Sequence, residues 1–151
     1  MTLNQTSSKR IFLADDDDDD CLMFRDALKE LGIESHLVIA SDGAELMSTL
    51  DDTVPPPPYV IFLDLNMPRK NGFDCLKEMR RTPKLKDIPV VIFSTSCAVE
   101  IIDKTYHEGA NYYVCKPNSF VNLKKTIDNI FSLDINDLQT QPDRNQFVLA
   151  A

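Results

Sequence analysis

The sequence contains no apolar stretch long enough to cross a bilayer, which takes about 20 consecutive apolar residues. Near the N-terminus, Lys9 and Arg10 precede a short apolar run, Ile11–Ala14, which is followed directly by six aspartates. That run is shorter than the hydrophobic region of a secretion signal. We therefore expect a cytoplasmic protein that does not act in a membrane.

Cysteine is scarce, and the pattern of the four cysteines indicates neither a disulfide framework nor a zinc site. They are widely spaced and include no C-x-x-C pair. We expect them to be small buried apolar residues of a protein in a reducing compartment. The four are Cys21, Cys75, Cys97 and Cys115.

Basic residues are outnumbered, 16 against 24 acidic ones, which gives a net charge of -8. Six of the acidic residues form a single run, Asp15–Asp20, so the excess of negative charge is mostly local. A surface with this balance repels nucleic acids and anionic lipid. We therefore predict that the chain binds neither nucleic acid nor membranes.

The remaining composition is that of one globular domain, with 151 residues of which 43% are hydrophobic. Short apolar runs alternate five times with segments of helical spacing. Several runs are continuously apolar, which indicates burial on both faces, as in a parallel sheet between two layers of helices. The predicted strands are 10–14, 36–40, 59–63, 89–93 and 111–115, and the predicted helices are 21–31, 44–50, 72–81, 99–108 and 119–133.

These elements predict a doubly wound α/β fold with five parallel strands, a (βα)5 arrangement. The pattern alone does not give the strand order, although 2-1-3-4-5 is the common order for five strands. The predicted domain covers residues 10–133. Residues 1–9 are predicted to be a flexible N-terminal tail, and residues 134–151 a C-terminal tail.

Polar side chains follow four of the predicted strands, at the point where each strand ends. The carboxyl ends of parallel strands share one edge of the sheet, so we expect these side chains to converge there. Two carboxylates about 4 Å apart repel by about 4 kcal/mol at an effective dielectric near 20, and a divalent cation would relieve that repulsion. Mg²⁺ suits such a site, with Mn²⁺ as an alternative. The residues are Asp15, Asp16, Asp64, Ser94, Thr95 and Lys116.

This set of residues favours transfer of a phosphoryl group to a carboxylate. Asp64, at the end of the central strand, would be the nucleophile and would become an aspartyl phosphate. The metal ion and Lys116 would stabilise charge on the transferring group, and Ser94 would hydrogen-bond one of its oxygens.

The sequence resembles a known family, the receiver domain of two-component response regulators, in its stand-alone, CheY-like form. The resemblance covers roughly residues 10–133 and implies the flavodoxin-like strand order 2-1-3-4-5. Each matching segment alone is weak evidence for the family, but the four segments together, in this order and spacing, are specific to it. The segments are I-F-L-A-D-D, I-F-L-D-L-N-M-P-R-K-N-G, P-V-V-I-F-S-T-S and Y-Y-V-C-K-P.

The resemblance implies a role for each residue that matches the family's acidic pocket. Asp64 matches the phosphoacceptor. Asp15 and Asp16 match the family's acidic pair. Asp16 would ligate the metal ion directly, and Asp15 would bind it mainly through a water molecule. Asn66 would give its backbone carbonyl to the metal.

The resemblance also implies roles on the fourth and fifth strands. Ser94, followed by Thr95, matches the family's hydroxyl residue, which moves toward the phosphate. Lys116 matches the family's lysine, and its bond to Pro117 is usually cis in the family. Tyr113 matches the aromatic residue that turns inward on phosphorylation.

As a function, the resemblance implies a single-domain response regulator without an output domain. A sensor histidine kinase or a histidine phosphotransfer protein would phosphorylate Asp64, and the phosphorylated form would change its affinity for an unidentified downstream protein. The output face would consist of the helix at 99–108, the strand at 111–115 and the helix at 119–133, through which many such receivers form homodimers. The sequence around Asp64 is similar to that of receivers paired with phytochrome-like or hybrid kinases.

Other interpretations stay open at this point. A haloacid-dehalogenase-type phosphatase uses similar residues, but its nucleophile lies on the first strand in a D-x-D motif, whereas the acceptor motif here reads Asp64-Leu65-Asn66. A receiver-like module that is never phosphorylated would lack one of the pocket residues, and none is missing. The additional aspartates are predicted to form a solvated helix N-terminus, where negative charge is favourable.

Overall fold

The computed structural model describes residues 9–149 and contains a six-stranded parallel sheet. Its strand order is β2-β1-β3-β4-β5-β6, so the predicted order 2-1-3-4-5 is confirmed and a sixth strand is added at one edge. The predicted N-terminal tail lies outside the described residues except for Lys9, which begins β1. The strands are β1 (Lys9–Ala14), β2 (Ser35–Ala40), β3 (Val60–Leu63), β4 (Val90–Ser94), β5 (Tyr112–Cys115) and β6 (Val148–Leu149).

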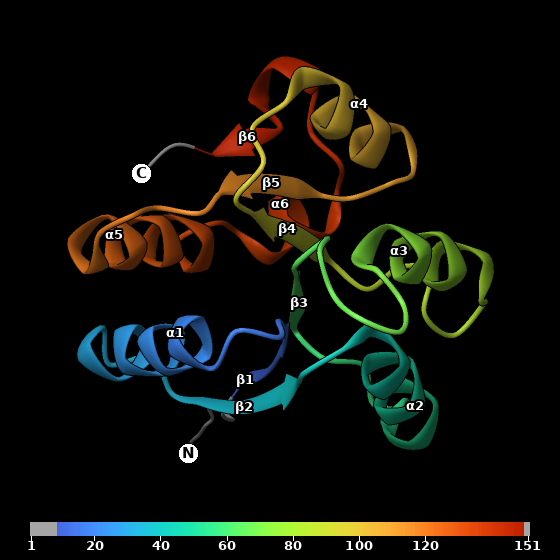
Figure 1. The fold of residues 1–151 in the computed structure, drawn as a ribbon, viewed down its shortest axis with the longest axis horizontal. Coiled ribbons are helices and arrows are strands. Elements are labelled where there is room, and N and C mark those ends of the chain that lie inside the picture. Colours follow the sequence, from blue (N-terminus) through green and yellow to red (C-terminus); the bar gives the residue numbers. More distant parts are fainter. Residues whose placement is uncertain (1–8, 150–151) are drawn as a thin grey trace.

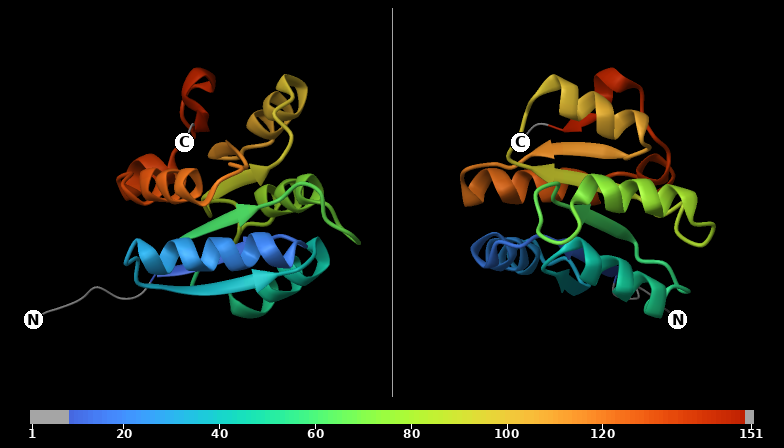
Figure 2. Two further views of the ribbon diagram at one scale, coloured as in Figure 1. Left: turned by 60° about the vertical axis from the view of Figure 1, so that its left-hand side comes forward. Right: turned by 45° about the vertical axis from the view of Figure 1, so that its right-hand side comes forward.

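Helices cover both faces of the sheet (Figure 1). α1 and α5 pack side by side on one face, while α2, α3 and α4 lie on the other (Figures 1 and 2). None of the helices within residues 9–149 is both long and apolar enough to cross a membrane. The helices are α1 (Asp18–Glu30), α2 (Gly43–Thr53), α3 (Gly72–Arg81), α4 (Val99–His107), α5 (Phe120–Phe131) and the short α6 (Ile135–Gln139).

The central strand shows why the apolar runs are continuous. All four residues of β3 are buried, and alternate side chains point to opposite faces. Ile61 and Leu63 pack in the layer with α2 and α3, whereas Val60 and Phe62 pack with α1 and α5. Both faces of this strand therefore belong to hydrophobic cores, as the sequence pattern predicted.

Helix starts lie at the carboxyl edge of the sheet and follow local capping signals. The Asp17 side chain accepts hydrogen bonds from the amides of Asp19 and Asp20 and begins α1. Asp42 caps α2, and its side chain accepts a hydrogen bond from the amide of Glu45 at 2.8 Å. At the far end of α1, Gly32 takes a φ of 69° and ends the helix.

The segment predicted to be a C-terminal tail is folded onto the domain. It forms α6, a 3-10 helix η1 (Arg144–Gln146) and β6, and β6 pairs in parallel with β5. Phe147 is completely buried, and its carbonyl accepts a hydrogen bond from the Tyr113 amide at 3.0 Å. The sequence predicted only a C-terminal tail here, because the segment is mostly polar before Phe147.

Candidate functional site

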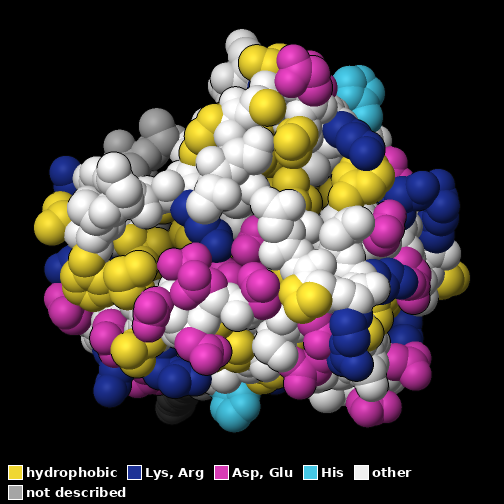
Figure 3. All heavy atoms as spheres, viewed as in Figure 1, with side chains coloured by type: hydrophobic (Ala, Val, Ile, Leu, Met, Phe, Trp, Pro, Cys, Tyr) yellow, Lys and Arg dark blue, Asp and Glu magenta, His cyan; other side chains and the backbone are white. Residues whose placement is uncertain are grey.

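Side chains from four neighbouring strands meet at the carboxyl edge of the sheet. Asp15 follows β1, Asp64 follows β3, Ser94 ends β4 and Lys116 follows β5. These strands are adjacent in the sheet, so residues far apart in sequence become neighbours. Figure 3 shows acidic side chains gathered near the centre of this view, with basic side-chain atoms beside them.

Three of the predicted carboxylates form a compact cluster. Asp15, Asp16 and Asp64 each offer an oxygen, and these oxygens all lie within 4.8 Å of one another. Asp15 and Asp64 are buried, while Asp16 is exposed to solvent. Backbone amides fix the buried pair: Asp17 donates to Asp15 Oδ1 at 3.0 Å, and Asn66 donates to Asp64 Oδ1 at 3.2 Å. An all-oxygen donor set with one open side fits a hard divalent cation such as Mg²⁺.

Lys116 lies against this cluster and pairs with three carboxylates. Its Nζ donates to Asp15 Oδ2 at 2.8 Å, to Asp20 Oδ2 at 2.8 Å and to Asp64 Oδ2 at 3.2 Å. Burial alone would lower the pKa of Lys116, but these partners raise it above its ordinary value. Lys116 therefore stays positively charged beside the buried acids.

Asp15 shows the cost of concentrating carboxylates here. Burial raises the pKa of Asp15 to about 6, and hydrogen bonds from Lys116 and Asp17 offset only part of that rise. Asp64 adds to the rise through its negative charge. The pocket thus disfavours its own negative charge, which a bound cation would relieve.

Asp20 is a site residue that the sequence prediction missed. It was assigned to the solvated end of the helix, yet its carboxylate pairs with Lys116. Asp20 precedes Phe24, a buried residue of α1, by four positions. This spacing places both side chains on the inward face of the helix, a signal that was present in the sequence.

Ser94 ends β4, and Asn66 and Thr95 lie in the loops around the cluster. Asn66 is exposed and contacts Asp64 through its backbone amide. Ser94 is buried, and its Oγ accepts a hydrogen bond from the Ser96 amide at 3.2 Å. Thr95 is exposed in the loop after β4.

Tyr113 points into the protein beneath the loop that follows β4. It is completely buried, and its hydroxyl donates to the Ser96 carbonyl at 2.7 Å. Burial raises the pKa of this hydroxyl above its ordinary value. The hydrogen bond ties β5 to the loop that begins with Ser94 and Thr95.

Comparison with known proteins matches residues 11–128 to the family model of the response regulator receiver domain. The chain belongs to this family. The family is one of signalling proteins, so membership favours the receiver interpretation over the phosphatase one.

Relatives of this receiver include stand-alone response regulators. Response regulator Rcp1 of Synechocystis sp. (strain ATCC 27184 / PCC 6803 / Kazusa) is 34% identical over 136 residues, which cover 87% of this chain and 92% of Rcp1. The structure of the phosphorylated cyanobacterial phytochrome response regulator RcpA superimposes with a TM-score of 0.76 at 33% identity, covering 82% of this chain and 91% of RcpA. The Mn²⁺-bound form of Rcp1 gives a TM-score of 0.75 at 33% identity, covering 89% of this chain and 99% of Rcp1.

The expected cis bond of this receiver is not present. Lys116–Pro117 is trans, and the cis peptide bonds within residues 9–149 are Val54–Pro55 and Pro55–Pro56. The trans form is the ordinary preference of an X-Pro bond, by about 0.5–1 kcal/mol. With this bond trans, Lys116 already reaches all three of its carboxylate partners.

The expectation for the cysteines was correct for two of the four. Cys21 and Cys75 are free and buried, whereas Cys97 and Cys115 are joined by a disulfide. Their separation of 18 residues gave no signal in the sequence. The pairing arises because β4 and β5 are adjacent, so the loop after β4 lies over the end of β5.

A glycine positions the acceptor loop of this receiver. A Cβ at Gly72 would overlap the carbonyl oxygen of Asp64, and the Gly72 amide donates to the Leu65 carbonyl at 3.0 Å. We expect Gly72→Ala to lower the free energy of unfolding by about 1–3 kcal/mol, because backbone must move to relieve the overlap. The displaced loop should also weaken Mg²⁺ binding about tenfold, as measured by calorimetric titration.

Gly32→Ala serves as the matched control for that change. Gly32 has a positive φ but no atoms within 4 Å of an added Cβ, and it lies at the end of α1 away from the carboxylates. The control should lose about 1 kcal/mol of stability through backbone strain and keep its Mg²⁺ affinity. Equal Mg²⁺ affinity in both variants would contradict a positioning role for Gly72.

Proposed function

We propose that this receiver accepts a phosphoryl group on Asp64 from the phosphohistidine of a sensor histidine kinase or a histidine phosphotransfer protein. One observation carries the proposal. Asp64 is a buried carboxylate held 3.2 Å from the ammonium of Lys116 and clustered with the carboxylates of Asp15 and Asp16. A phosphorylated structure of the relative RcpA supports it.

In the proposed reaction, an oxygen of Asp64 attacks the phosphorus atom, and the bond from phosphorus to the histidine nitrogen breaks. The histidine keeps the bonding electrons, so no proton transfer to or from Asp64 is needed. Lys116 stabilises the negative charge of the phosphoryl oxygens, and the Ser94 hydroxyl donates a hydrogen bond to one of them. These groups lie on the ends of β3, β4 and β5, which position them around the acceptor.

Asp15, Asp16 and Asp64, with the backbone carbonyl of Asn66, would hold the divalent cation. When bound, Mg²⁺ neutralises charge on the carboxylates and on the phosphoryl oxygens. A Mn²⁺-bound structure of the relative Rcp1 supports a divalent ion as a ligand of this receiver.

Phosphorylation would act on partners by shifting a population between two states of the loop after β4. Ser94 begins this loop, and Tyr113 is bonded to its Ser96, so movement of Ser94 toward the phosphoryl group is coupled to the Tyr113 side chain. The predicted output face of α4, β5 and α5 is modified by β6, which covers the edge of β5. A downstream protein would therefore meet α4 together with the C-terminal segment.

The name of RcpA, a phytochrome response regulator, supports a phytochrome-like kinase as the phosphodonor. A kinase of that type with its catalytic part in the cytoplasm would place this receiver there too.

The proposal is tested by incubating the protein with acetyl phosphate and Mg²⁺ and measuring its intact mass. We expect one phosphoryl adduct, which disappears when EDTA removes the cation, because the carboxylates otherwise repel the incoming phosphoryl oxygens. Beryllium fluoride binding, measured by calorimetry, is the second readout for a receiver that rejects small donors. A protein that shows neither the adduct nor beryllium fluoride binding would be a phosphorylation-independent module.

A further inference from the structure

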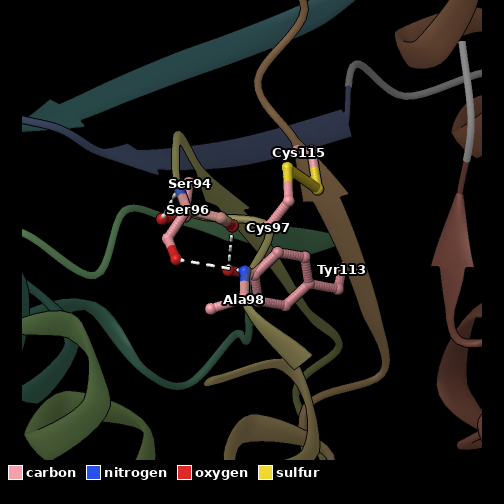
Figure 4. The surroundings of a disulfide bond; sticks show 6 residues. All are labelled: Ser94, Ser96, Cys97, Ala98, Tyr113 and Cys115. Atoms are coloured by element: carbon pink, nitrogen blue, oxygen red, sulfur yellow. Dashed lines mark hydrogen bonds between the residues drawn. A yellow bond between two sulfur atoms is a disulfide. The ribbon is translucent and has the colours of Figure 1, made fainter. Parts of the chain in front are cut away.

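The disulfide between Cys97 and Cys115 lies next to the phosphorylation site. Cys97 is exposed in the loop between β4 and α4, and Cys115 is half-buried at the end of β5. Their Cα atoms are 5.7 Å apart, a distance typical of cysteines that form a disulfide without backbone movement. Figure 4 shows the bond above the Tyr113 ring and to the right of Ser94 and Ser96.

This bond joins the two segments that carry phosphoryl-contacting groups. Ser94 lies three residues before Cys97, and Lys116 directly follows Cys115. The same loop is also held to β5 by the hydrogen bond from Tyr113 to Ser96. The disulfide therefore adds a covalent link between these two segments, beside the backbone hydrogen bond from the Lys116 amide to the Ser94 carbonyl at 2.8 Å.

The remaining cysteines are poor competitors for an oxidant. Cys21 and Cys75 are both free, and burial raises the pKa of the Cys75 thiol to about 11, whereas the thiolate is the reactive form. Both side chains are also buried, whereas Cys97 is exposed. Oxidation of the reduced protein should therefore begin at Cys97 and end with Cys115.

We propose that Cys97 and Cys115 form a reversible redox modification site, at which oxidation by a peroxide increases the rate of phosphorylation of Asp64. The inference rests on the proposed function, because it assigns a regulation to that same site. In the oxidised protein the loop is already ordered, so less conformational freedom is lost when Ser94 and Lys116 engage the phosphoryl group. Reduction leaves the loop held to β5 by the hydrogen bond from Tyr113 to Ser96 without the covalent link, and so weakens this advantage.

The chemistry balances with hydrogen peroxide as the oxidant. The Cys97 thiolate attacks one peroxide oxygen, the O–O bond breaks and hydroxide leaves, giving a sulfenic acid. The Cys115 thiolate then attacks the Cys97 sulfur, and the second hydroxide leaves as the S–S bond forms. Two thiols lose two electrons and two protons, and the peroxide becomes two waters. A dithiol reductant reverses the change by exchange.

The test compares the oxidised and the reduced protein after the peroxide or the reductant has been removed. Intact mass, after unreacted thiols have been alkylated, shows whether the oxidised monomer has lost two hydrogens and two alkylation sites. Phosphorylation by acetyl phosphate and Mg²⁺ is then followed over time. We expect the oxidised form to react at least about threefold faster. Cys97→Ser is the matched variant, and it should react at the rate of the reduced parent under both conditions.

Each other result has a defined meaning. Failure to form the intramolecular disulfide, equal or slower phosphorylation of the oxidised form, or a redox response that persists in Cys97→Ser would overturn the inference alone. If the disulfide forms but neither redox form is phosphorylated or binds beryllium fluoride, the proposed function itself is overturned, and the inference with it.

Discussion

Replacing Asp64 by asparagine is expected to abolish the phosphoryl adduct formed with acetyl phosphate and Mg²⁺. The amide has nearly the shape of the carboxylate but lacks the negatively charged oxygen that attacks phosphorus. Asp64 also contributes one of the three clustered ligand oxygens, so the variant should bind Mg²⁺ more weakly. Intact mass spectrometry checks the adduct, and calorimetric titration checks the metal.

Asp52→Asn is the control for the loss of one negative charge. Asp52 lies at the exposed end of α2, and the variant should form the adduct as the parent does. An adduct that persists in Asp64→Asn would identify a different acceptor. The first candidate would then be Asp20, which shares Lys116 with Asp64.

Phe147→Ala is expected to lower the free energy of unfolding by about 3–5 kcal/mol, the usual range for deleting a fully buried phenylalanine. Phe147 is completely buried, with its ring centroid 5.0 Å from that of Tyr106 and 6.2 Å from that of Tyr113. Its removal leaves a cavity between α4 and β5, in the core layer that also holds Ile102. Urea unfolding of the parent and the variant measures the difference.

The neighbouring residue gives a matched control. Val148 follows Phe147 and begins β6, but it keeps 38% of its surface exposed, so Val148→Ala should cost less than about 1 kcal/mol. Similar small losses in both variants would mean that the C-terminal segment adds little to the domain. The expected result extends the stable unit from residue 133 to residue 149.

The sequence by itself determined the architecture and the outline of the site. Burial on both faces requires continuously apolar strands, and such a run is visible in Val60–Leu63. Parallel strands joined by helices place all their carboxyl ends at one edge, so the convergence of Asp15, Asp64 and Lys116 could be predicted without coordinates. The N-terminal cap of α2 is also a local interaction, because the Asp42 side chain accepts a hydrogen bond from the amide of Glu45, only three residues away.

Tertiary structure alone decided the contacts that depend on which loops lie against which strands. The Lys116–Asp20 pair spans 96 residues, and only the docking of α1 brings its first turn to β5. Cys97 meets Cys115 because β4 and β5 are adjacent, and Phe147 is buried because β6 adds to the free edge of β5. Local periodicity carries no information about such pairings, since their energies appear only when distant segments are packed together.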